Sequence, residues 1–154
     1  MEFEIVPFVG VENLRFGMTP QQVADILGAP SSIGEGYYGE RQEYRTDGND
    51  LLVTYDEKDN TAVHFGFWPK MRGLSFKEKK LFQMPELEAL AVLIKEDDSP
   101  YEVLGIINFL GLGITMSGFH EEDPSQKAVA VYKSGDLDSQ FGSIKKHAIP
   151  FKLP

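Results

Sequence analysis

The stretch MTPQQVADILGAP, residues 18–30, carries a complete set of signals for one short helix. Thr19 is suited to cap the helix, and Gln22, three residues later, completes a capping box. Pro20 falls on the first helical position, where its missing N–H costs nothing. Gly28 suits the left-handed position that ends a helix, and the proline two residues further on prevents continuation. The sequence therefore predicts a helix between this threonine and this glycine.

Three strand-like segments follow the helix. They cover residues 37–45, 51–55 and 62–68. Strands so close in sequence, separated by short turn-like connections, pair antiparallel. The basic segment 69–84 that comes next is open to two interpretations. A hairpin turning at Lys77 and Glu78 is favoured over a short helix capped by Ser75.

The same order of elements occurs again in the second half of the chain. Apolar residues at helical spacing from Leu87 to Ile94 predict a second helix over 85–96. Three more strand-like segments follow at 103–108, 112–116 and 128–132. A helix followed by a three-stranded meander is thus predicted twice, at nearly equal length. The tail, residues 137–154, has little regular pattern.

The phrase LRFGMTPQQV, residues 14–23, followed by ILGAP, residues 26–30, resembles a known opening signature. It has the pattern G-M-T-x-x-x-V-x-x-x-L-G-x-P of the SmpA/OmlA family, whose fold is called BamE-like. The resemblance implies an α+β fold, with an antiparallel sheet and helices packed on one face. Two tandem, closely packed modules, arranged as in β-lactamase inhibitory protein, would occupy residues 1–72 and, with the tail, 73–154.

The resemblance also implies a kind of function. The family includes an outer-membrane assembly lipoprotein, protein inhibitors of enzymes and small cytosolic immunity proteins, which have protein binding in common. This chain has no cysteine to carry a lipid, and its acidic first residues lack the basic flank of a secretory signal. We therefore expect a non-catalytic, cytoplasmic immunity protein that neutralises a secreted bacterial toxin. An envelope-assembly or structural adaptor of the SmpA type is the alternative, and a small enzyme is a third.

Composition excludes several other classes. The 154 residues contain no cysteine, so disulfide frameworks, zinc–cysteine sites and cysteine nucleophiles are impossible. No window approaches the ~20 apolar residues that a membrane helix needs. Acids outnumber bases 24 to 15, and the net charge of -9 argues against nucleic acid as a partner. The acidity either keeps the surface solvated or steers a basic partner. The expected partner is a basic toxin domain, and this protein is expected to be a monomer or weak dimer.

Candidate chemistry is sparse. The three histidines are His64, His120 and His147, and no G-x-S-x-G nucleophile motif accompanies them. His120 precedes three acids, but consecutive side chains diverge, and a solvated turn is favoured over a metal site. Gly111-Leu112-Gly113 lacks both the Lys-Ser/Thr of a phosphate-binding loop and the third glycine of a dinucleotide-binding turn. We expect no catalytic residue, metal or cofactor.

Strand alternation instead predicts a protein-binding face. If Phe65 and Phe67 point into the core, His64 and Trp68 point the other way. The same alternation in the second half leaves Thr115 and Tyr132 outside. Aromatic residues among small ones and among carboxylates suit a surface for a basic protein, although the tail or the second half could instead cover these rings. The predicted partner-binding residues are Tyr37, Tyr38, Glu40, Glu43, Tyr44, Asp47, His64, Trp68, Thr115 and Tyr132.

Overall fold

A computed structural model describes residues 2–45, 50–120, 127–137 and 147–151. Over these residues the chain forms two β-sheets, two α-helices and one short 3-10 helix. Its coarse class is α+β with a large share of strand. The larger sheet has eight strands in the order β10-β11-β12-β13-β7-β6-β5-β4, and every neighbouring pair is antiparallel. The smaller sheet has the order β3-β2-β1-β8-β9, in which β1 and β8 run parallel.

The strands of the larger sheet are β4 (Ser32–Glu35), β5 (Arg41–Arg45), β6 (Leu51–Tyr55), β7 (Ala62–Phe67), β10 (Tyr101–Val103), β11 (Ile106–Phe109), β12 (Ile114–Ser117) and β13 (Ala128–Tyr132). Those of the smaller sheet are β1 (Phe3–Val6), β2 (Gly10–Val11), β3 (Leu14–Arg15), β8 (Leu74–Phe76) and β9 (Lys79–Lys80). The helices are α1 (Pro20–Leu27), the 3-10 helix η1 (Leu81–Gln83) and α2 (Glu86–Ile94).

Helix α1 begins and ends as its sequence predicts. The hydroxyl of Thr19 accepts a hydrogen bond from the Gln22 N–H at 3.2 Å, and the Gln22 side chain accepts from the Thr19 N–H at 2.9 Å. The capping box is therefore complete. Gly28 has φ 81° and ψ -176°, and its N–H donates to the Ala24 carbonyl at 2.8 Å. The positive φ is confirmed, but with an extended ψ this glycine occupies a region that other residues hardly enter.

The two helix ends give the first prediction. Thr19→Ala should lower the free energy of unfolding by about 1 kcal/mol, because one helix N–H loses its acceptor. Gly28→Val should cost about 1–3 kcal/mol from backbone strain, since a Cβ there meets no neighbouring atom. Gly34→Ala is the matched control, because Gly34 has the same open surroundings without a positive φ. If urea unfolding shows that Gly28→Val lowers the free energy of unfolding no more than Gly34→Ala does, the positive φ assigned to Gly28 is contradicted.

Several strands differ from the sequence prediction. In the predicted strand over 37–45, residues 37–40 instead form part of a turn. This turn connects β5 to β4, an edge strand that the sequence analysis does not predict. The Gly36 N–H closes this turn on the Glu40 carbonyl at 2.8 Å. The predicted strand over 103–108 is also interrupted, because Leu104 and Gly105 have positive φ and form the turn between β10 and β11. Over the described residues, each helix is therefore followed by four strands of the larger sheet rather than three.

The hairpin interpretation of the basic segment is confirmed. Strands β8 and β9 pair through Ser75 with Lys80 and Phe76 with Lys79. Lys77 and Glu78, both with positive φ, make the turn between them.

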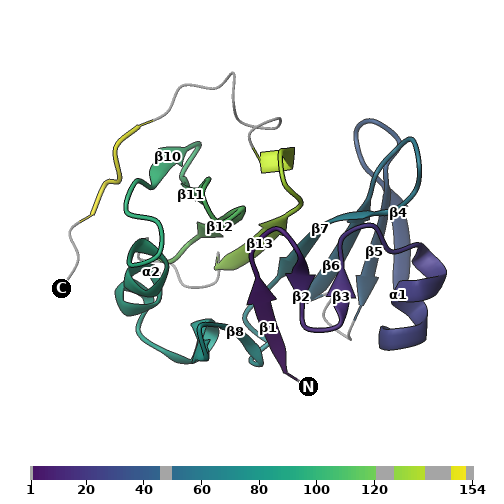
Figure 1. The fold of residues 1–154 in the computed structure, drawn as a ribbon, viewed down its shortest axis with the longest axis horizontal. Coiled ribbons are helices and arrows are strands. Elements are labelled where there is room, and N and C mark those ends of the chain that lie inside the picture. The colour runs from purple at the N-terminus through teal and green to yellow at the C-terminus, as the bar shows by residue number, and fades with distance from the viewer. Residues whose placement is uncertain (1, 46–49, 121–126, 138–146, 152–154) are drawn as a thin grey trace.

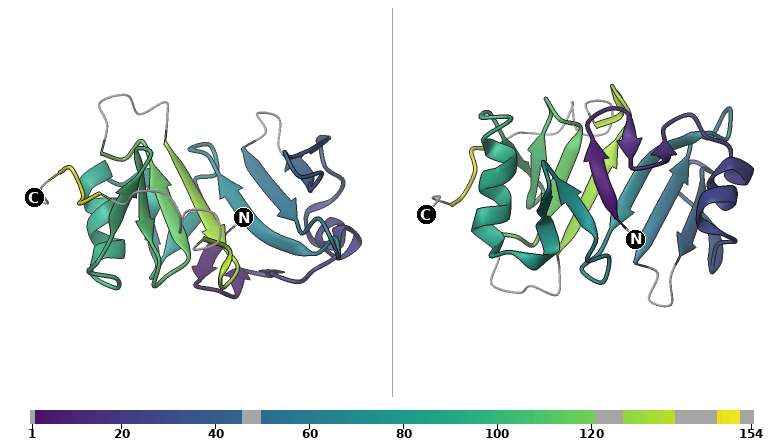
Figure 2. Two further views of the ribbon diagram at one scale, coloured as in Figure 1. Left: turned by 90° about the horizontal axis from the view of Figure 1, so that it is seen from above. Right: turned by 60° about the horizontal axis from the view of Figure 1, so that its bottom comes forward.

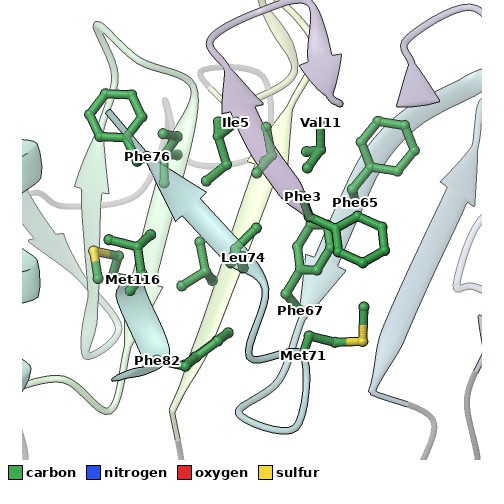
Figure 3. Packing of buried hydrophobic residues seen from close by; sticks show 14 of the residues in the cluster. Phe3, Ile5, Val11, Phe65, Phe67, Met71, Leu74, Phe76, Phe82 and Met116 are labelled. Carbon is green, nitrogen blue, oxygen red and sulfur yellow. The ribbon is translucent and has the colours of Figure 1, made fainter. Parts of the chain in front are cut away.

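One face of the larger sheet, here called the inner face, carries Phe65 and Phe67 and packs against β1 and β8. Figure 3 shows Phe3 of β1 beside these two rings, and the ring centroids of Phe3 and Phe67 lie 5.9 Å apart. The helices were expected to cover this face, but they lie at opposite ends of the molecule with β1 between them (Figures 1 and 2). The small sheet covers the centre because Phe3 and Ile5, at alternate positions of β1, supply the apolar side chains.

Candidate functional site

Glu43 is predicted from the sequence to bind a partner, but its side chain is buried. It lies on the inner face, is 1 % exposed and accepts three hydrogen bonds. Tyr55 donates at 2.7 Å, Arg45 at 2.9 Å and Arg41 at 2.8 Å. Burial alone would raise the pKa of Glu43, but these three donors outweigh it and hold the pKa below its usual value. A carboxylate so enclosed stabilises the fold and is inaccessible to a partner.

The same cluster joins the sheet to α1. The Arg45 guanidinium also donates to the Gly28 carbonyl, at 3.2 Å from Nη2 and 3.3 Å from Nε. The carbonyl at the end of the helix thus receives a cation, which suits its partial negative charge. Burial, followed by the hydrogen bond to Glu43, raises the pKa of Tyr55, so that tyrosine stays protonated and donating.

Glu43→Gln should therefore destabilise the protein by about 3 kcal/mol, because two buried or half-buried arginines lose their counter-charge. The folded-state pKa of Glu43 lies below the unfolded value of 4.5. Its stabilisation is thus present above pH 4.5 and is lost as pH falls through the folded-state pKa. Acid unfolding of Glu43→Gln should show a smaller loss in this range. Glu88→Gln, on the exposed side of α2, should behave as the wild type.

The opposite face of the larger sheet, here called the outer face, carries His64 and Tyr132 side by side. Their ring centroids lie 4.7 Å apart, and their strands pair at this position. Nδ1 of His64 lies 3.0 Å from the Thr54 hydroxyl. Tyr132 is only 7 % exposed and is hydrogen-bonded to Thr115. Burial raises the pKa of Tyr132 to about 12, against the lowering effect of that bond and with a smaller rise from Asp136.

Burial also lowers the pKa of the half-buried His64 to about 4 from 6.5. The folded protein therefore resists protonation of this ring while the unfolded chain accepts it. Stability should fall as pH drops from 6.5 towards 4, and the unfolding free energy of His64→Asn should depend less on pH across this window. The exposed His147 offers the control His147→Asn. A His64 ring that titrates near 6.5 by NMR would contradict the prediction.

A cleft of about 690 Å³ opens beside these two rings, at the end of the outer face where β6 and β13 finish. The β4–β5 and β6–β7 turns that border it rise at the upper right of Figure 1. Its lining consists of Tyr37, Tyr38, Glu40, Gln42, Leu52, Thr54, Tyr55, Asp56, Glu57, Val63, His64, Tyr132 and Asp136. Four of these described residues are carboxylic acids, and none of them is lysine or arginine. The cleft is therefore acidic.

Two tyrosines form the rim of the cleft on the β4–β5 turn. Tyr37 is 93 % exposed and Tyr38 75 %, and their rings meet edge to face with centroids 5.0 Å apart. The Tyr38 N–H donates to the Glu40 carboxylate at 2.9 Å, so this acid is held against the turn. Aromatic side chains are enriched where proteins bind one another, so two adjacent exposed rings suit a binding surface.

The other carboxylates differ in their surroundings. Asp56 accepts from the N–H of Lys58 at 2.8 Å and, more weakly, from that of Asp59, and these backbone bonds lower its pKa. Burial raises the pKa of Asp136; Lys133 opposes this, and the negative charge of Asp56 adds to the rise. Asp136 is thus a partly buried carboxyl group whose charged form is disfavoured by its burial.

The structure brings together half of the predicted binding residues. Those that line the cleft are Tyr37, Tyr38, Glu40, His64 and Tyr132. Tyr44, Trp68 and Thr115 lie on the outer face but outside the cleft, with Thr115 buried under Tyr132. Glu43 faces inward, which corrects its assignment, because β5 alternates between the two faces. Asp47 lies outside the described residues.

Sequence reasoning missed three of the acids in the cleft, Asp56, Glu57 and Asp136. The first two occupy the predicted turn between β6 and β7, and a meander brings that turn beside the start of β5. Their position was therefore derivable from the predicted strand order. Asp136 was not, because it reaches the cleft through the pairing of β13 with β7, which are far apart in sequence.

Other chemistry has little support in the described part of the chain. Within residues 2–45, 50–120, 127–137 and 147–151, no three His, Asp or Glu side chains are grouped to hold a metal ion. Nε2 of His120 lies 3.7 Å from the Glu102 carboxylate, and the three acids after it fall outside the described residues. Over the same ranges no helix has the length and apolar character to cross a membrane.

In comparisons with known proteins, no family model, no curated protein and no solved structure matches this chain.

Proposed function

We propose that this protein is a non-catalytic inhibitor that binds a basic protein through the acidic cleft and its tyrosine rim. The observation that carries the proposal is the cleft itself, in which four carboxylic acids and two exposed aromatic rings share one end of the sheet. Charges of one sign lining a cleft raise the rate at which an oppositely charged partner arrives. Aromatic side chains then supply the desolvated contacts that hold it.

The partner most consistent with these features is a toxin domain, which makes the chain a cytoplasmic immunity protein. The 14–30 signature and the repeated order of one helix followed by four strands support the finer proposal of two BamE-like modules. A hydrolytic role for His64 has less support, because its Nδ1 meets a threonine hydroxyl rather than the carboxylate that orients a catalytic histidine.

The proposal predicts that a toxic domain is encoded beside the gene of this chain, and the test pairs the two proteins. Co-expression should rescue bacterial growth, and the purified proteins should associate more slowly at ~0.5 M salt because exposed charges are screened. Neutralising Glu40, Glu57 and Asp136 to the matching amides should lower the association rate about tenfold and the dissociation rate constant much less. The matched control neutralises the exposed acids of the other end, Glu88, Glu96 and Asp98.

If both triple variants slow association equally, the attraction comes from the charge of the whole surface and the cleft has no special part in it. Failure of rescue, together with capture of a cell-envelope complex that binds the same cleft, would favour the adaptor role instead.

A further inference from the structure

We infer that the cleft receives an arginine side chain of the partner, whose guanidinium group stacks on the tyrosine rim and pairs with the carboxylates behind it. This inference rests on the proposed function and specifies its chemistry. A volume of about 690 Å³ exceeds what one side chain needs, so the guanidinium can enter with part of its neighbouring backbone.

The rim favours arginine over lysine. A planar guanidinium lies flat on an aromatic face and gives up its water more readily than a compact ammonium group. Tyr37 and Tyr38 together present such faces, because their edge-to-face contact leaves both rings largely exposed. Carboxylates within the same cleft supply the paired acceptors that the fork of guanidinium N–H groups fits.

Among the residues that the structure describes, no lysine or arginine lines this cleft. Arg41, adjacent in sequence to Glu40, points to the inner face, where its guanidinium binds Glu43 at 2.8 Å. Lys58 and Lys133 are exposed and influence Asp56 through space, and neither is among the lining residues. Within the described part of the chain, the carboxylates of the cleft therefore have no lysine or arginine beside them in the lining, which suits a cation supplied by a partner.

Gly36 keeps one acceptor in position. A Cβ added at this glycine would lie 1.7 Å from Oε1 of Glu40, so the carboxylate occupies space that only glycine leaves open. Gly36→Ala should displace the Glu40 carboxylate from the rim without removing any charge. Gly34→Ala, two residues earlier on β4, meets no atom and is the matched control.

The probe is an N-acetylated, C-amidated pentapeptide with one arginine between serine and glycine residues. Its citrulline counterpart has nearly the same shape without the charge, and its lysine counterpart keeps the charge without the planar fork. NMR titration of the full chain should show saturable shifts at Tyr37, Tyr38 and Gln42 with the arginine peptide. The citrulline peptide should bind about tenfold more weakly, because charge-assisted hydrogen bonds are lost, and the lysine peptide should fall between them.

Variants locate the site. Gly36→Ala and Asp136→Asn should each weaken binding of the arginine peptide several-fold, whereas Gly34→Ala should not. Tyr38→Ala removes an exposed ring of the rim without disturbing the core. It should also weaken binding of the arginine peptide, so the site can be tested even if Gly36→Ala fails to fold. Citrulline binding as tightly as arginine, or arginine shifts that map away from the cleft, would overturn the inference. Equal binding of lysine would overturn the choice of arginine.

The outcome is separable from that of the proposed function. If growth is rescued and association depends on salt, but the cleft does not select arginine, the guanidinium site is contradicted and the inhibitor role stands. Arginine selectivity without rescue of growth would leave the site and remove the toxin as its partner.

Discussion

The alternation of side chains along the paired central strands β7 and β13 is the constraint on which both halves of this structure depend. Phe65, Phe67, Val129 and Val131 all point to the inner face, because the register sets Phe65 opposite Val131 and Phe67 opposite Val129. A shift of one residue in either strand would turn this apolar set to solvent. The same register sets His64 opposite Tyr132 on the outer face, so core packing and the cleft are fixed together.

Charge is sorted by the same alternation. On β5, Arg41, Glu43 and Arg45 point inward and form a hydrogen-bonded cluster with Tyr55, while the intervening Gln42 points towards the cleft. The two arginines of β5 therefore form hydrogen bonds within the protein and do not line the cleft. The acids of the adjoining turns lie at the cleft, so the inner side of β5 holds two arginines bound to one glutamate while the outer side borders an acidic surface.

The outer face is divided along its length. Near the cleft it presents polar and acidic groups around His64 and Tyr132, whereas towards the opposite end Trp68 lies over Gly66. Thr115 on β12 and Asn108 on β11, which lie on the same face, are buried. A partner guided by charge would meet the acidic end first, and the exposed tyrosines stand on a turn fixed by backbone hydrogen bonds, so little order has to be gained on binding.

The sequence by itself determined what short-range chemistry controls. The capping box and terminal glycine of α1, the ranges of β6 and β13, helix α2 and the β8–β9 hairpin all follow from residues within a few positions of one another. Contacts between distant residues decided the parallel pairing of β1 with β8, the inward position of Glu43 and the arrival of Asp136 in the cleft. Local propensity and alternation specify that a strand has two faces. Which face is buried, and which distant strand lies beside it, depends on the apolar area that the whole chain buries together.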